Sequence, residues 1–147
     1  MSVVIATAAT DEAPVVVVHG LADLRAVFAA AGAAGKPLVA WTAPGAAGYA
    51  GVLYLKKAVE AARADVGEAP VRVVLDCGGD AGHALGALRM GWTDIAFGGV
   101  PKLREKILRI ADQTGARLVA PDSAAALDLL DESDPEAACR KVLADRR

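Results

Sequence analysis

The fold of this chain is read most directly from the stretch Val71-Arg-Val-Val-Leu-Asp76-Cys77-Gly78-Gly79-Asp80. It begins as a β-branched run of strand length and ends abruptly in an acid, a thiol and two glycines. Such a run, bounded by turn residues, predicts a buried strand. In α/β proteins the loops at the carboxyl ends of strands present side chains and backbone amides to ligands. Asp76 and Cys77 are therefore the first candidates for a functional site.

Outward from this stretch, short apolar runs alternate with helix-length amphipathic segments. The pattern predicts strands at 15–18, 38–42, 71–76, 94–97 and 117–120. It predicts helices at 21–31, 47–64, 81–90, 101–115, 124–130 and 135–144, the fifth capped by Asp122 and Ser123. Strands that are apolar on both faces belong in a parallel sheet covered by helices. We therefore expect an α/β fold of about five βα units.

Two architectures fit about five βα units with a parallel sheet. One is a flavodoxin-like three-layer sandwich, and the other is a TIM half-barrel, because five units cannot close an eight-stranded barrel. Residues 1–13 are expected to form a loose N-terminal segment, and residues 14–147 a single α/β domain. An exposed sheet edge would pair in a homodimer or dock against a partner protein.

Composition restricts the classes of partner. The formal net charge is -2, and the sequence has no basic cluster outside its C-terminal tail, so no nucleic-acid partner is expected. No apolar run is long enough to span a membrane, and no signal-peptide pattern opens the sequence, so we expect no membrane partner. The two cysteines, Cys77 and Cys139, lie far apart, which predicts a reduced cytoplasmic protein.

Three segments carry a further pattern in their order along the chain. They are Pro37-Leu-Val-Ala-Trp-Thr-Ala-Pro-Gly-Ala-Ala-Gly48-Tyr49-Ala-Gly51, Val73-Val-Leu-Asp76 and Ala84-Leu-Gly-Ala-Leu-Arg-Met-Gly91-Trp-Thr-Asp-Ile-Ala-Phe-Gly98-Gly99. In this order, from His19 to Pro121, the chain resembles the N-terminal half of class II (zinc-dependent) fructose- or tagatose-bisphosphate aldolases. In that family one strand ends in Leu-Asp-His and the strand after the next helix ends in Asp-Gly-Ser.

The departures from the family pattern concern its chemistry. Asp76 falls where the family places its catalytic acid, but the zinc-ligating histidine that follows is Cys77 here. Gly98 takes the place of the aspartate of Asp-Gly-Ser, and Val100 takes the place of its serine. The family's other zinc histidines belong to later strands than this chain contains. The resemblance thus implies the scaffold without the metal ligands, and we expect neither a metal nor a cofactor.

Asp76 and Cys77 have two readings. As a catalytic pair, Asp76 would act as a general base and Cys77 as a nucleophile or soft metal ligand, since a thiol near a helix N-terminus can have a lowered pKa. Alternatively, Asp76 is a loop acid that accepts backbone amide hydrogen bonds beside a buried, inert thiol. Asp80, His83 and His19 are further potential metal ligands, but Cys77 and His83 are six residues apart across a glycine-rich loop, which matches no compact zinc spacing.

Glycine-bearing loops predict an anion site. Gly98 and Gly99 follow a strand and precede a helix, so free backbone amides would face the strand ends. Gly45 and the pair Gly78 and Gly79 occupy the equivalent position in two other units. Three such loops on one sheet edge would bind a small anionic ligand, for instance one carrying a phosphate.

Two functions remain open. The first is a non-catalytic or degenerate aldolase-like module that binds a small molecule or regulates another protein. The second is a small lyase or other enzyme that acts on a sugar phosphate or carbonyl substrate through Asp76 and Cys77. The missing metal ligands and the missing acid of Asp-Gly-Ser favour the first.

Overall fold

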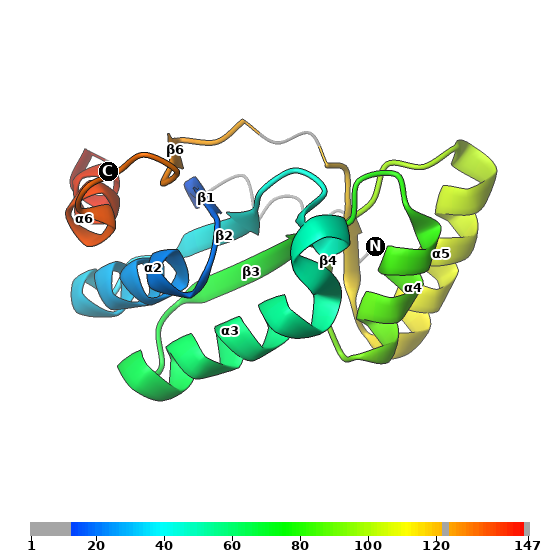
Figure 1. Cartoon of the computed structure of the whole chain (residues 1–147), viewed down its shortest axis with the longest axis horizontal. Helices are drawn as coiled ribbons and strands as arrows, with labels where there is room; N and C mark the ends of the chain where they lie inside the picture. Colours follow the sequence, from blue (N-terminus) through cyan, green and yellow to red (C-terminus); the bar gives the residue numbers. More distant parts are fainter. Residues whose placement is uncertain (1–12, 122–123, 146–147) are drawn as a thin grey trace.

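The computed structural model describes residues 13–121 and 124–145. Within these ranges strands and helices alternate (Figure 1). The elements are β1 (Val15–Val18), α2 (Leu21–Ala34), β2 (Leu38–Thr42), the π-helix η1 (Ala47–Gly51), α3 (Val52–Val66), β3 (Val71–Asp76), α4 (Ala81–Arg89), β4 (Asp94–Ala96), α5 (Pro101–Thr114), β5 (Arg117–Val119), β6 (Leu127–Asp128) and α6 (Pro135–Asp145). The first five strands and their helices confirm the predicted βα alternation.

The six strands form one parallel sheet in the order β5-β4-β3-β2-β1-β6. From β1 to β5, each strand lies beside its predecessor in the chain. Right-handed crossovers that all step in one direction place their helices on one face of the sheet. A flavodoxin-like sandwich instead has the order 2-1-3-4-5 and helices on both faces. The strand order therefore differs from the flavodoxin-like order and is consistent with the half-barrel arrangement.

The two faces of the sheet bury different side chains. Val16, Leu75 and Ile95 point toward the helices and join the main core. A separate cluster on the opposite face contains only strand residues and Ala13; its buried members are Ala13, Val15, Val39, Trp41, Val74 and Ala96. Because side chains alternate along a strand, Asp76 lies on the same face as Val74. Trp41 and Asp76 therefore meet on the face away from the helices.

Some of the glycines end helices, but one lies inside a helix. Gly35 and Gly115 adopt left-handed backbone conformations, with φ of 65° and 76°, and end α2 and α5. The sequence predicted that α2 would stop at residue 31, but the helix continues through Gly32. A single glycine costs only about 1 kcal/mol inside a helix, and the buried Val27 and Phe28 stabilise α2 by packing on the core.

The predicted helix at 124–130 is wrong. This segment contains β6, which pairs in parallel with β1 through Leu127 and Asp128. The amide of Ala126 donates to Val15 O at 2.8 Å, and the amide of Leu129 donates to Val17 O at 3.1 Å. A helix this short is unstable alone, and the edge of β1 offers backbone partners that no local pattern reveals. The predicted cap, Asp122 and Ser123, lies outside the described residues.

The return of β6 to β1 brings α6 against α2, so the last βα unit sits beside the first (Figure 1). None of the helices in the described part of the chain is long and apolar enough to cross a membrane.

Candidate functional site

The carboxyl edge of the sheet brings together the loops that follow β2, β3 and β4. Asp76 lies at their meeting point, with 2% of its surface exposed. The register places Leu75 and Asp76 of β3 beside Ile95 and Ala96 of β4. The loops that the sequence singled out are therefore adjacent in space, as expected for parallel strands that end at one edge.

The carboxylate of Asp76 accepts three hydrogen bonds. Oδ1 accepts from the amide of Gly45 at 3.0 Å and from the amide of Gly78 at 2.9 Å. Oδ2 accepts from Nε1 of Trp41 at 3.1 Å. The amide of Asp76 itself donates to the Thr42 hydroxyl oxygen at 2.8 Å. A buried carboxylate with both oxygens hydrogen-bonded thus joins the β2 loop to the β3 loop.

The β4 loop is tied to the same cluster by the amide of Gly98, which donates to Gly78 O at 2.8 Å. The two glycines of this loop are also needed for packing. A Cβ on Gly98 would lie 2.8 Å from Pro121 Cγ, and a Cβ on Gly99 would lie 2.4 Å from Phe97 Cζ. Both distances are shorter than carbon atoms tolerate, so a side chain at either position requires neighbouring atoms to move.

These contacts bear on the predicted anion site. The amides of Gly45, Gly78 and Gly98 already donate to protein acceptors. A Cβ on Gly79 would meet no atom within 4 Å, and the same is true of Gly45. The loops are thus brought together as predicted, but three of the five amides offered for an anion are used to hold the loops in place.

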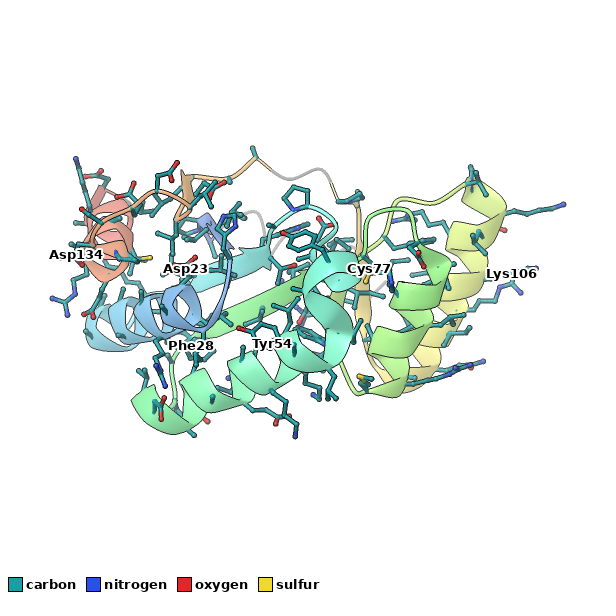
Figure 2. All side chains as sticks on the ribbon, in the orientation of Figure 1. Asp23, Phe28, Tyr54, Cys77, Lys106 and Asp134 are labelled. Carbon is teal, nitrogen blue, oxygen red and sulfur yellow. The ribbon has the colours of Figure 1, made fainter. Side chains whose placement is uncertain are left out.

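Cys77 lies where β3 ends (Figure 2), with 2% of its surface exposed. Burial raises the pKa of its thiol to about 12, and the negative charges of Asp76 and Asp80 act in the same direction. The thiol lies 3.8 Å from the carbonyl oxygen of Leu75. A helix N-terminus would lower the pKa of Cys77, so the structure gives the opposite of that expectation. The thiol is protonated at neutral pH.

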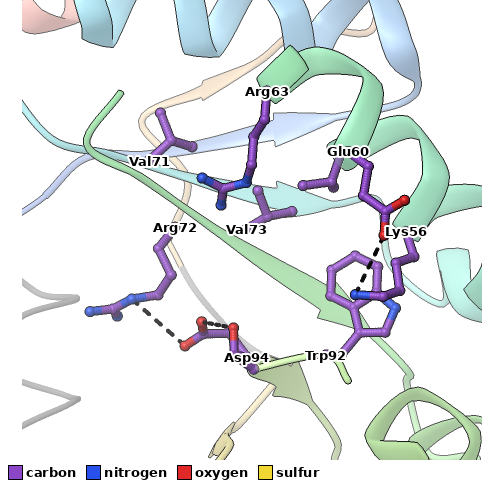
Figure 3. Close-up of a pocket in the computed structure, with 10 residues that line it drawn as sticks. Lys56, Glu60, Arg63, Val71, Arg72, Val73, Trp92 and Asp94 are labelled. Atoms are coloured by element: carbon purple, nitrogen blue, oxygen red, sulfur yellow. Dashed lines mark hydrogen bonds and ion pairs between the residues drawn. The ribbon is translucent and has the colours of Figure 1, made fainter. Parts of the chain in front are cut away.

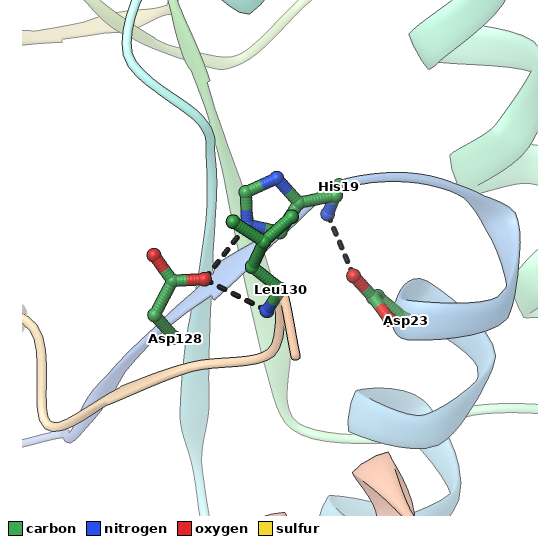
Figure 4. A network of polar contacts seen from close by, with 4 residues as sticks. All are labelled: His19, Asp23, Asp128 and Leu130. Carbon is green, nitrogen blue, oxygen red and sulfur yellow. Dashed lines mark hydrogen bonds and ion pairs between the residues drawn. The ribbon is translucent and has the colours of Figure 1, made fainter. Parts of the chain in front are cut away.

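A second polar cluster at this edge includes a partner that the sequence reading missed (Figure 4). Nε2 of His19, at the end of β1, lies 2.7 Å from Oδ1 of Asp128 in β6. The same oxygen accepts from the amide of Leu130 at 2.9 Å, and the amide of His19 donates to Asp23 at 2.8 Å. Asp128 escaped notice because its segment was expected to be helical. The cluster fastens β6 to β1.

The potential metal ligands near Asp76 do not form a zinc site. The Cys77 thiol is protonated and buried, and the Asp76 oxygens are taken by three N–H donors. His83 instead faces Asp80, with Nδ1 3.5 Å from Oδ2, and His19 pairs with Asp128. Among the residues that the structure describes, no group of three or more His, Cys, Asp or Glu side chains could hold a metal ion.

Comparison with known proteins finds similarity to solved structures. A solved structure from Coccidioides immitis, provisionally identified as a fructose-1,6-bisphosphate aldolase, superposes on 72% of this chain with a TM-score of 0.58 and 19% sequence identity. The match covers 39% of that protein's chain. This identity level shows a shared α/β fold and carries no information about activity. No family model matches the chain, and no curated protein matches it.

Trp41 and Thr42 are the other site residues whose roles the sequence did not reveal. Both lie at the carboxyl end of β2. Their contacts with Asp76 follow from the register, in which Trp41 of β2 lies beside Val74 of β3. A tryptophan and a threonine at one strand end, next to a strand that ends in aspartate, are the signal that could have indicated this cluster.

Proposed function

We propose that this chain is a non-catalytic, aldolase-like module that binds a small phosphate-bearing molecule at the carboxyl edge of its sheet. The arrangement of Asp76 carries this proposal. Its carboxylate accepts from Trp41, Gly45 and Gly78 and is buried, so it organises the loops instead of taking a proton from a substrate. A general base needs a lone pair within reach of the substrate, and these hydrogen bonds occupy that position.

The enzyme alternative receives less support from the same geometry. A nucleophilic thiol must be accessible and deprotonated, whereas Cys77 is buried and its pKa is raised to about 12. Catalysis by Asp76 and Cys77 would require the β3 loop to open and both groups to become exposed.

The ligand site that we propose is formed by the open side of the β3 and β4 loops. Gly79 is the best candidate to approach a phosphate, because the space next to its Cα is open. We also propose, from the sequence, a cytoplasmic location and pairing through an exposed sheet edge, either with a second copy or with a partner protein.

Titration of the protein with inorganic phosphate and with fructose 1,6-bisphosphate tests this function. In amide NMR spectra we expect the signals of Gly79 and Gly99 to shift saturably, and the variant Gly79→Ala to bind more weakly with unchanged stability. The same samples, supplied with zinc, are assayed for retro-aldol cleavage. Stoichiometric zinc binding together with cleavage would establish the enzyme alternative. Signals that do not move with either probe would refute a phosphate site at this edge.

A further inference from the structure

A cavity of about 280 Å³ lies at the opposite edge of the sheet, where β3 and β4 begin (Figure 3). It exists because β3 pairs with β4 only at Leu75 and Asp76, so the first half of β3 diverges from its neighbour. The gap admits side chains from both faces of the sheet. The lining residues are Lys56, Val59, Glu60, Arg63, Val71, Arg72, Val73, Trp92, Thr93 and Asp94.

The charged part of this lining is positive. Lys56, Arg63 and Arg72 outnumber Glu60 and Asp94, although the whole chain has a net charge of -2. Both carboxylates already have cationic partners. Oε1 of Glu60 lies 3.4 Å from Nζ of Lys57, a residue that does not line the cavity, and Oε2 lies 3.9 Å from Nζ of Lys56. Oδ1 of Asp94 lies 3.6 Å from Nε of Arg72.

Arg63 has donors to offer. Its guanidinium carbon lies 5.0 Å above the centre of the Phe28 ring, which holds the group through a cation–π contact, and its N–H groups make no hydrogen bond within the described part of the chain. Within the described ranges, no carboxylate lies within 4.0 Å of it. The ammonium of Lys56 is ion-paired with Glu60 at 3.9 Å, a separation longer than a hydrogen bond, so it can still donate to an anion.

Apart from Thr93, the uncharged part of the lining is apolar. Trp92 provides an aromatic wall, held where its indole N–H donates to Val52 O at 3.4 Å, and Val59, Val71 and Val73 complete the surface. A cavity of about 280 Å³ has the volume of about nine waters, so it would hold a molecule of similar heavy-atom count.

We propose that this cavity binds a small organic anion, a carboxylate or a phosphate monoester. The anionic group would lie between Arg63 and Lys56, and the organic part would pack against Trp92 and the valines. The carboxyl-edge site of the proposed function is at the other end of the strands, so this second site does not depend on it.

Two probes of suitable size, benzoate and phenyl phosphate, test the proposal at constant ionic strength, with benzyl alcohol as the neutral comparison. The readout is the indole N–H signal of Trp92 in NMR spectra, assigned with Trp92→Phe. We expect a saturable shift with both anions and none with the alcohol. Arg63→Gln should weaken anion binding about tenfold, because a charge-assisted hydrogen bond is lost.

Arg109→Gln is the matched control, because it removes an exposed arginine of α5 that does not line the cavity. It should bind the anions as the unmodified protein does. Equal affinity of Arg63→Gln and Arg109→Gln would overturn the proposal, as would equal binding of benzyl alcohol or a Trp92 signal that no anion shifts. A thermal melt of each variant verifies that it is folded, and Lys56→Gln provides an independent second measurement.

Discussion

Trp41 donates its indole N–H to the carboxylate of Asp76 across 3.1 Å, and this bond joins β2 to β3 on the face of the sheet away from the helices. Two glycine amides complete the coordination of the same carboxylate. An acid at the end of a barrel strand is usually examined for catalysis. Here its hydrogen bonds identify it as the group around which the loops are assembled.

Replacing Asp76 with asparagine should destabilise the protein by about 1–3 kcal/mol. The amide side chain keeps one acceptor for the glycines but turns its NH2 group toward the Trp41 N–H, so two donors face each other. Urea denaturation measures the loss. Asp80→Asn is the control, because Asp80 caps α4 by accepting from the amide of His83 and asparagine caps a helix equally well. Equal stability of the two variants would contradict the structural role of Asp76.

The cysteines should be unreactive in the folded protein. Burial is the main cause that raises the pKa of both Cys77 and Cys139 to about 12, so the reactive thiolate is scarce at pH 8. Ellman's reagent should label neither thiol quickly in the native state and both thiols in guanidinium chloride. Rapid native labelling that mass spectrometry assigns to Cys77 would show an accessible thiolate and would revive the enzyme alternative.

Gly99→Ala should cost about 1–3 kcal/mol, because the added Cβ would lie 2.4 Å from Phe97, a fully buried ring that has little room to move. Gly79→Ala adds the same methyl group in open space and should change the free energy of unfolding by less than about 0.5 kcal/mol. Thermal unfolding of the two variants provides the comparison. If both were equally stable, the packing described for the β4 loop would be wrong.

Fastening of β6 to β1 should depend on pH. The hydrogen bond from His19 is the main cause that lowers the pKa of Asp128, and the amide of Leu130 contributes in the same direction. A lowered folded-state pKa gives stability that is present above the ordinary value of about 3.9 and is lost as the pH falls through the folded-state pKa.

The effect should stay below about 1 kcal/mol, because the pair is largely exposed. Comparing the native protein with Asp128→Asn in urea at neutral pH and at acid pH isolates it. The two proteins should differ at neutral pH and converge in acid. A difference that persists unchanged in acid would rule out the ionised carboxylate as its source.

The βα alternation could be predicted because strand and helix periodicities are local properties of the chain. The strands Val15–Val18, Leu38–Thr42 and Val71–Asp76 have the bounds that their sequence pattern predicted. The prediction of a helix at 124–130 is wrong because the structure of this segment depends on a distant part of the chain. Its strand is only two residues long and exists because β1 offers hydrogen-bond partners, which is a property of the assembled sheet.

For the candidate site, too, one part could be predicted from the sequence and another part depends on the tertiary structure. The positions of Asp76, Cys77 and the glycines at one sheet edge follow from the chain order of strands and loops. Their chemistry does not, because a carboxylate can be a base or a structural acceptor according to which donors surround it. Only the register that brings Trp41, Gly45 and Gly78 to Asp76 distinguishes these roles.

The sequence by itself therefore determined the α/β class, the first five strands and the location of the Asp76 cluster, because each depends on residues close together in the chain. The tertiary structure alone gave the strand order, placed β6 beside β1, and set the hydrogen bonds of Asp76 and the burial of Cys77. These features depend on contacts between distant segments and on burial. Val71–Asp76 is thus a strand whose terminal acid could be read from the sequence, whereas the role of that acid is fixed by its neighbours.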